Sequence, residues 1–479
     1  MKSKKGQRAP LRLLGHAIGT AIVALLATPA GAAETATTAS AASTANTATA
    51  ITADLSEPRE LTPLGERLLF VAYTPALSQA LFSVSKATGA VERLGTVAPG
   101  FRGAFPSGLV RFGNAVYFAM NDGTSGFELW ASDGTTAGTR QVLDIQPGAE
   151  DSIPAGMTVF DGQLYFSARR GAEAPRLWAT RGDRASTAPV VSAAELANPR
   201  QFTVAGGRLY FTASDAEHGN ELWVIDRAGA APRLVRDVRS GPEDSNVSQL
   251  TAVGNTLFFA ANDGRHGVEL WKTDGSSAGT TIVKDIRPGI DASRPNYLTA
   301  VGSWLYFAAD DGAHGIELWR SNGSEAGTSL VMDIQPGTNH SGVAYMTAIG
   351  NVAYFTATNG RNGLELWRSD AGDSRTAMVA DLLPGAEGSL PNHLARVGDR
   401  LYFSAIDGTR EQQPWRTDGT PGGTLRIGAP NDALGLPYPS RFTAFGDAVA
   451  FVARDASGKE RLWQVDAKGA VSRLGADTP

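Results

Sequence analysis

Cysteine is absent from the 479 residues of this chain, and charged residues make up only 19% of it. Without cysteine, the protein has no disulfide framework, thiolate zinc site, iron–sulfur cluster, cysteine nucleophile or lipoprotein anchor. The formal net charge of −5 is not the strongly basic balance that predicts nucleic-acid binding. No segment sustains the apolar period of an amphipathic helix. The 55 glycines and 8% aromatic residues are instead typical of a turn-rich β protein.

The first 32 residues have the three parts of an export signal. Five basic residues form a positive head, an apolar run extends from Leu13 to Thr28, and Ala30-Gly31-Ala32 supplies a cleavage site. The alternative is an uncleaved anchor, but a run of 16 residues is short for a membrane span of about 20 residues. We therefore predict a signal peptide over 1–32, a secreted or cell-surface protein, and no membrane span after cleavage.

Residues 33–53 are predicted to form a disordered linker, because Ala, Thr and Ser make up 16 of the 18 residues 33–50 and cannot bury a core. Cleavage would remove five of the 43 basic residues and none of the 48 acidic residues, which leaves 38 against 48, a formal charge of −10. A mature protein this acidic is not expected to bind nucleic acid or anionic lipid.

From residue 54 onward the chain repeats itself, and this self-similarity is its strongest structural signal. A phenylalanine recurs every 48 residues, with one interval of 45, at Phe70, Phe118, Phe166, Phe211, Phe259, Phe307, Phe355, Phe403 and Phe451. A second aromatic follows each by 12 residues, at Phe82, Trp130, Trp178, Trp223, Trp271, Trp319, Trp367, Trp415 and Trp463. Nine such units fill the chain without a linker, so we predict one repeat domain over 54–479.

Each unit is predicted to contain four short strands, which we call A to D. In the sixth unit they cover 296–302, 304–310, 316–321 and 329–334. A glycine five residues before the phenylalanine marks the A–B turn in eight units, and Asp161 replaces it in the third. Both residue types suit a tight turn with positive φ.

A four-stranded unit cannot cover both of its own faces, whereas radial stacking of such units buries them in a β-propeller. We predict an all-β protein with nine four-stranded repeats of about 48 residues in one nine-bladed ring, although propellers usually have about four to eight blades. A linear β-solenoid is the alternative. Residues 50–55 resemble 377–382 of the seventh unit, which suggests that the amino-terminal segment adds a strand to the last blade.

The units carry a recurring text: ELWASDGTTAGT (128–139), ELWKTDGSSAGT (269–280) and ELWRSNGSEAGT (317–328). The chain resembles the bacterial ELWxxDGT repeat family, whose members are also described as hyalin-like repeat proteins. The resemblance implies a secreted or surface repeat protein of unassigned function. It implies no catalytic residue, cofactor or metal ligand.

Residues that recur in every unit are explained by the repeated fold, and residues that vary are free to serve function. The glutamates two residues before the tryptophans are Glu128, Glu221, Glu269, Glu317 and Glu365. We expect these buried carboxylates to accept hydrogen bonds from the DGT loop that follows, since a buried charge needs partners. The loop aspartates are Asp133, Asp274 and Asp418, and one Asp followed at once by Gly favours an Asx-turn over a calcium site.

Three histidines recur in register, five residues before their tryptophans: His218, His266 and His314. They belong to neighbouring blades, which are about 10 Å apart, so they are predicted to be solvated loop residues rather than a shared metal site. The recurring serines, Ser152, Ser245, Ser293, Ser341 and Ser389, have no nucleophile-elbow pattern around them and are predicted to be turn hydroxyls.

These observations leave two classes of function. The favoured one is an exported, non-catalytic binding or adhesion scaffold that presents a propeller face to a protein or glycan. The alternative is a secreted enzyme that uses the central funnel, such as a polysaccharide lyase or hydrolase, or a quinoprotein. Propellers support both, but no single unit has a unique cluster of acids, His or Tyr. We predict no catalytic residue, cofactor or metal.

The predicted ligand face carries the B–C and D–A loops, because strand direction alternates and these loops share one side of the ring. In the middle units the C–D loops have nearly the same sequence, whereas the B–C loops differ between units, as recognition requires. The D–A segments vary as well, at Glu150, Asp151, Tyr297, His340, Tyr345 and His393. The candidate ligand-binding residues are Arg265, His266, His314, Arg361 and Arg410.

Overall fold

The computed structural model describes residues 55–475 apart from 76–77, 99–100, 102, 192–194, 373–374, 409–410 and 429–434. The described residues belong to a single compact unit, Ala50–Pro479. The predicted signal peptide (1–32) and linker (33–53) lie outside the described residues. Among the residues that are described, no helix is long and apolar enough to cross a membrane.

The described part of this unit consists of strands and their connections. The first three sheets comprise β1 (Ser56–Leu64), β2 (Arg67–Thr74), β3 (Ser78–Ser85), β4 (Val91–Leu94); β5 (Ser107–Phe112), β6 (Ala115–Asn121), β7 (Phe127–Ser132), β8 (Arg140–Leu143); β9 (Ala155–Phe160), β10 (Gln163–Ala168), β11 (Arg176–Thr180), β12 (Ala188–Pro189). The next three comprise β13 (Ala197–Ala205), β14 (Arg208–Asp215), β15 (Gly219–Ile225), β16 (Arg233–Arg236); β17 (Ser248–Val253), β18 (Thr256–Asn262), β19 (Val268–Thr273), β20 (Thr281–Lys284); β21 (Asn296–Val301), β22 (Trp304–Asp310), β23 (Ile316–Ser321), β24 (Ser329–Met332). The last three comprise β25 (Ala344–Ile349), β26 (Val352–Ala357), β27 (Glu365–Asp370), β28 (Thr376–Ala380); β29 (Asn392–Val397), β30 (Arg400–Ala405), β31 (Gln413–Thr417), β32 (Leu425–Arg426); β33 (Ser440–Phe445), β34 (Ala448–Arg454), β35 (Glu460–Val465), β36 (Val471–Arg473).

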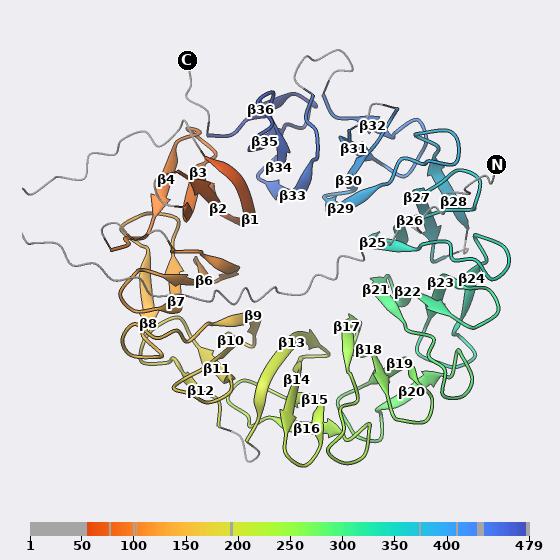
Figure 1. Ribbon diagram of the computed structural model, residues 1–479, viewed down its shortest axis with the longest axis horizontal. Helices are drawn as coiled ribbons and strands as arrows, with labels where there is room; N and C mark the ends of the chain where they lie inside the picture. Colours follow the sequence, from red (N-terminus) through yellow and green to blue (C-terminus); the bar gives the residue numbers. More distant parts are fainter. Residues whose placement is uncertain are drawn as a thin grey trace, which may run out of the picture. The chain divides into compact units, whose positions relative to one another are not determined.

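Each sheet contains four strands that are consecutive in the chain and antiparallel, and the nine sheets form the blades of one ring (Figure 1). The first strand of each blade is innermost and contacts the first strands of its neighbours, as β21 contacts β17 and β25. The prediction of a nine-bladed β-propeller is confirmed, and the linear solenoid is wrong because blade 1 packs against blade 9. The predicted positive φ of the A–B turns is also confirmed, including 46° at Asp161.

The repeated aromatic pairs occupy the interfaces between blades. In every blade the phenylalanine of the second strand lies directly opposite the aromatic of the third strand, as Phe259 does with Trp271. Both pack against Val224 and Val235 of the preceding blade in one buried cluster. Because each blade closes the core of the one before it, the aromatics recur with the period of the fold.

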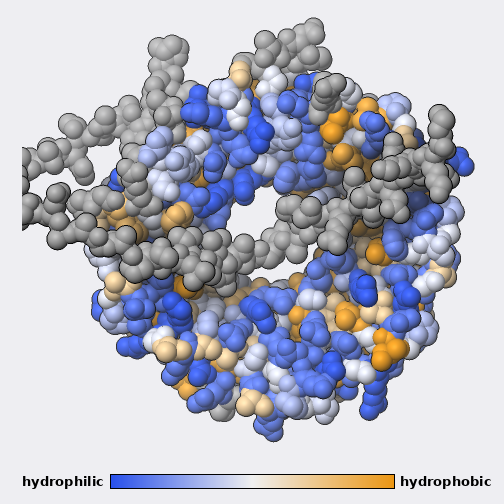
Figure 2. Space-filling view, in the orientation of Figure 1, coloured by the Kyte–Doolittle hydropathy of each residue, from blue (hydrophilic) through white to orange (hydrophobic). Residues whose placement is uncertain are grey.

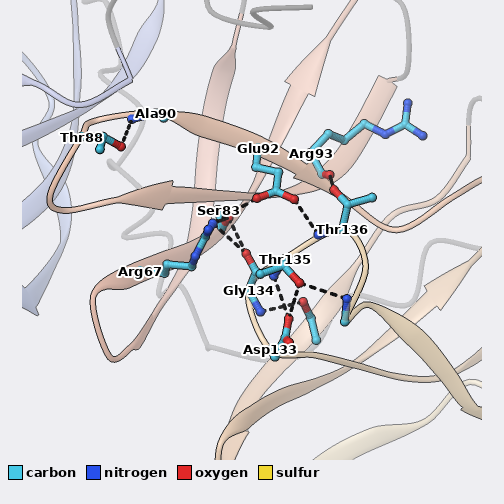
Figure 3. Close-up of polar contacts among 12 residues, drawn as sticks. Arg67, Ser83, Thr88, Ala90, Glu92, Arg93, Asp133, Gly134, Thr135 and Thr136 are labelled. Carbon is cyan, nitrogen blue, oxygen red and sulfur yellow. Dashed lines mark hydrogen bonds and ion pairs between the residues drawn. The ribbon is translucent and has the colours of Figure 1, made fainter. Parts of the chain in front are cut away.

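In blade 2, the DGT loop between the third and fourth strands joins the blade to the preceding one (Figure 3). Asp133 Oδ1 accepts the N–H of Thr135 at 2.9 Å, which confirms the predicted Asx-turn. The Gly134 carbonyl accepts bonds from Arg67 and from Ser83 of the first blade. The final glycine of the motif is needed for space, since a Cβ at Gly138 would lie 2.1 Å from Asp133 Oδ1.

The same inter-blade contact recurs around the ring. The carbonyl of Gly323 accepts a bond from Lys272 Nζ at 2.6 Å, and that of Gly419 accepts one from Arg368 at 2.9 Å. The C–D loops therefore share a sequence motif because they hold neighbouring blades together.

Ring closure depends on side-chain packing between blades 1 and 9. Strand β1 packs against β33 and β35, and Phe70 and Phe82 share a buried cluster with Phe445. An ion pair of 2.8 Å joins Lys86 to Asp447. The described sheet of blade 9 is completed by its own β36. The amino-terminal strand predicted around residues 50–55 lies, except for Leu55, outside the described residues.

Candidate ligand-binding face

The recurring glutamates belong to the scaffold, but their partners differ from the prediction. Glu128 accepts bonds from Ile145 N and Ser152 Oγ, both at 2.7 Å. Glu269 is bonded in the same way to Ile286 N and to Ser293. The expectation that the DGT loop supplies these donors is wrong: they come from the D–A connection, because the third strand points its glutamate toward that end of the blade. The recurring serines thus tie this connection to the glutamate.

Burial changes the acid–base behaviour of these glutamates. It raises the pKa of Glu128, Glu221, Glu269 and Glu317 to about 7, against the opposing effect of their hydrogen-bond donors. A perturbed carboxyl of this kind often marks a functional site. Here each side chain is fully buried and the arrangement repeats from blade to blade. Repetition and burial together assign these carboxyls to the scaffold.

The B–C loops carry the predicted ligand residues, and their histidines are tied within their own loops. Asp263 accepts the N–H groups of Arg265 and His266 and lies 2.8 Å from His266 Nδ1. Burial opposes ionisation of Asp263, but these donors hold its pKa below the ordinary value. His314 is paired with Asp311 at 2.7 Å, and this hydrogen bond raises the pKa of His314. His218 pairs with Asp215 in the same manner.

The structure places the predicted ligand residues on three consecutive blades. Arg265 and His266 lie in the B–C loop of blade 5, His314 in that of blade 6 and Arg361 in that of blade 7. Arg265 and Arg361 are exposed, and among the described residues their guanidinium groups have no hydrogen bond or ion pair. Arg410 lies outside the described residues. No comparison or contact tests the role of these residues, which stays a prediction.

The inner strands present a second set of variable residues that the sequence reasoning did not identify as a set. Each inner strand has a register shift near its start, as between Asn296 and Thr299. A bulge of this kind turns side chains out of the ladder. Ten residues before each repeated phenylalanine, φ is positive at Glu60, Gly108, Gly156, Gln201, Gln249, Tyr297, Tyr345, His393 and Arg441. Thirteen residues before it, φ is positive at Glu57, Phe105, Ile153, Asn198, Asn246, Arg294, Gly342, Leu390 and Tyr438.

These eighteen residues, which we call the inner rim, differ from blade to blade although their backbone conformation is the same. They lie at the start of the innermost strands, around the central opening that Figure 2 shows. Tyr297, Tyr345 and His393 belong to this rim and lie within β21, β25 and β29, so placing them in the D–A loops was wrong. A non-glycine residue with positive φ is uncommon. Because this conformation recurs in all nine blades it belongs to the repeated fold, whereas the side chains at these positions vary.

Some rim side chains contact the next blade and others do not. Glu60 accepts the N–H of Leu109 at 3.0 Å, and the Tyr297 and Tyr345 rings are 6.4 Å apart. Desolvation is the main cause that lowers the pKa of His393, and electrostatic repulsion from Arg441 lowers it further. The rim is therefore asymmetric: at the position ten residues before the phenylalanine, glycines lie in blades 2 and 3, amides in blades 4 and 5, tyrosines in blades 6 and 7, and His393 and Arg441 in blades 8 and 9.

A cleft of about 580 Å³ opens where blades 1 and 9 meet. Its lining residues are Ser56, Glu57, Pro58, Arg59, Tyr73, Pro75, Arg441, Arg454, Gly458, Lys459 and Glu460. Inner-strand and B–C loop residues contribute together, so the cleft lies at the same end of the blades as the predicted ligand face. None of the predicted ligand residues lines it. The sequence does contain an indication of this cleft. The ninth unit has arginine at two positions, Arg441 and Arg454, where the other units have mostly uncharged residues.

Comparison with known proteins supports no assignment beyond the fold. No protein-family model matches the sequence, and no curated protein does either. The structure is similar to a puromycin hydrolase with a TM-score of 0.40, at 15% identity over 85% of this chain and 58% of the other. It is similar to a prolyl endopeptidase with a TM-score of 0.40, at 12% identity over 77% and 54%. The β-propeller domain of the Trilobed protease from Pyrococcus furiosus matches with a TM-score of 0.38, at 12% identity over 80% and 99%.

The chain spans little more than half the length of the first two of these proteins.

Proposed function

We propose that the protein is an exported, non-catalytic binding or adhesion scaffold that presents the B–C and D–A face of its propeller to a protein or glycan outside the cytoplasm. One observation carries this proposal: the repeated glutamates and serines are buried, whereas the varied residues of the B–C loops and the inner rim are mostly exposed. The resemblance to ELWxxDGT repeat proteins and the export signal in the sequence agree with it.

Recognition on this face is spread around the ring. Arg265, His314 and Arg361 lie on successive blades, and each would contribute one weak contact. Several weak contacts at regular spacing bind a repetitive polymer by avidity, without a single deep pocket. Asp263 accepts the N–H groups of both Arg265 and His266 and so holds the loop shape, which lowers the entropic cost of binding.

A glycan array and a pull-down with the mature protein test this function. Combined replacement of Arg265, Arg361 and Arg410 by Gln, together with His266→Gln and His314→Gln, should weaken binding of any ligand found. The matched control removes three arginines from the opposite loops: Arg181→Gln, Arg184→Gln and Arg227→Gln. Loss of binding in the control alone would place the ligand on the other face. Failure to bind any glycan or protein would oppose the scaffold function itself.

A further inference from the structure

The cleft between blades 1 and 9 concentrates positive charge in an acidic protein. Its lining contains four basic residues and two acidic ones, Glu57 and Glu460. Arg441 projects from the rim on β33, and Arg454 ends β34 of the same blade. Within the described part of the chain, neither guanidinium group has a hydrogen bond or ion pair to protein. Such groups are strong donors for a bound carboxylate, which they can engage in bidentate fashion.

Aromatic side chains accompany the two arginines. Arg454 lies over the ring of Tyr438, with 4.5 Å between the guanidinium carbon and the ring centre, and Tyr438 is a partly exposed residue outside the lining of the cleft. Tyr73 lines the cleft from blade 1 with 37% of its surface exposed. Exposed tyrosines provide flat apolar area at low entropic cost, next to a hydroxyl group that can hydrogen-bond.

Glu57 completes the set from the rim of blade 1. Its side chain is exposed in the cleft and has no hydrogen-bond or ion-pair partner among the described residues. An ionised carboxylate only accepts hydrogen bonds, so Glu57 would repel a second anion but would accept bonds from hydroxyl groups. The cleft thus combines donors for one carboxylate, an acceptor for hydroxyls and the apolar face of Tyr73 for a ring.

We propose that this cleft binds a carboxylated sugar residue of an acidic polysaccharide, with Arg441 and Arg454 on the carboxylate, Glu57 on ring hydroxyls and Tyr73 against the sugar ring, while Tyr438 supports the guanidinium group of Arg454. The proposal rests on the scaffold function proposed above and specifies its ligand at one place on the same face. A volume of about 580 Å³ is within the range of about 300–1,000 Å³ of small-ligand sites.

Binding of oligogalacturonate and of its methyl ester to the mature protein, measured by calorimetry, tests the cleft. The two ligands share the sugar ring and hydroxyls and differ in the carboxylate charge. The acid form should bind, the ester should bind at least about tenfold more weakly, and salt should weaken the acid form because screening reduces charge attraction. The double variant Arg441→Gln, Arg454→Gln should raise the Kd for the acid form by at least about tenfold.

The control variant is Arg181→Gln with Arg227→Gln, which removes the same charge from the opposite loops and should leave the Kd unchanged. Arg454→Gln alone gives a second variant that leaves the positive-φ backbone of Arg441 untouched, and the ester comparison needs no variant. Equal binding of acid and ester, or full binding by the double variant, would overturn the cleft assignment. Equal or tighter binding of poly-glutamate through the same arginines would replace the sugar by an acidic peptide.

The two proposals fail in different ways. If oligogalacturonate does not bind but another ligand from the array binds through the B–C loops, the cleft assignment is wrong and the scaffold function stands. If the protein binds no ligand of the array and does not bind oligogalacturonate, both proposals are wrong.

Discussion

Replacement of buried Glu269 tests how the blades tolerate an internal carboxyl group. Its pKa of about 7 in the folded protein is above the ordinary 4.5, with burial as the main cause. A proton is therefore bound more tightly in the folded state than in the unfolded chain. The resulting stabilisation is fully present below pH 4.5 and is lost as the pH rises through 7. A difference of about 2.5 units corresponds to about 3 kcal/mol.

Glu269→Gln keeps the size of the side chain and removes this titration. Relative to the unsubstituted protein, the stability of the variant should rise by about 3 kcal/mol between pH 4.5 and pH 8. Glu269→Ala removes the acceptor altogether and leaves the N–H groups of Ile286 and Ser293 buried without it. At about 1–3 kcal/mol for each orphaned donor, the alanine variant should lose about 2–6 kcal/mol.

Urea unfolding followed by tryptophan fluorescence at pH 4.5, 6 and 8 measures both effects. Glu325→Gln is the control, because Glu325 is exposed in a C–D loop and its replacement should change stability by no more than about 0.5 kcal/mol at any pH. If the glutamine variant instead becomes less stable relative to the unsubstituted protein as the pH rises, the folded state prefers the ionised carboxylate. The hydrogen-bond donors would then outweigh burial, and the reasoning would be refuted.

Three further predictions concern the ring and its export. Trp271→Ala should destabilise the propeller by about 3–5 kcal/mol in thermal or urea unfolding, since it empties an inter-blade slot; a cost below about 1 kcal/mol would contradict this role. Gly423→Ala should cost about 1–3 kcal/mol, because its Cβ would lie 2.0 Å from Asp418 Oδ1, whereas Gly422→Ala, with open space around it, should be nearly neutral; equal effects would count against the packed DGT loop. Intact-mass analysis of exported protein should find its first residue at or near Ala33, and recovery of the full-length chain in the cytoplasm or inner membrane would oppose export.

The repeat determined most of the architecture from sequence alone. The fixed period gives every unit an aromatic pair equivalent to Phe307 and Trp319. Between the repeated turns the sequence predicted strands over 304–310 and 316–321, which are the observed bounds of β22 and β23. The sequence also predicted local backbone conformation. The Asx-turn at Asp133 and the positive φ at Asp161 depend on residues adjacent in the chain. The number of blades followed because each unit must bury its faces against the next.

The tertiary structure alone decided which distant groups meet. The partners of Glu128 lie 17 and 24 residues away, in a loop whose position depends on how the blade joins its neighbour, so the nearer DGT loop was the wrong expectation. The inner rim was missed because Gln249 and Tyr297 differ in type and share only a backbone conformation. The cleft brings Glu57 beside Arg441 across 384 positions of sequence, because closure of the ring places the first blade against the last.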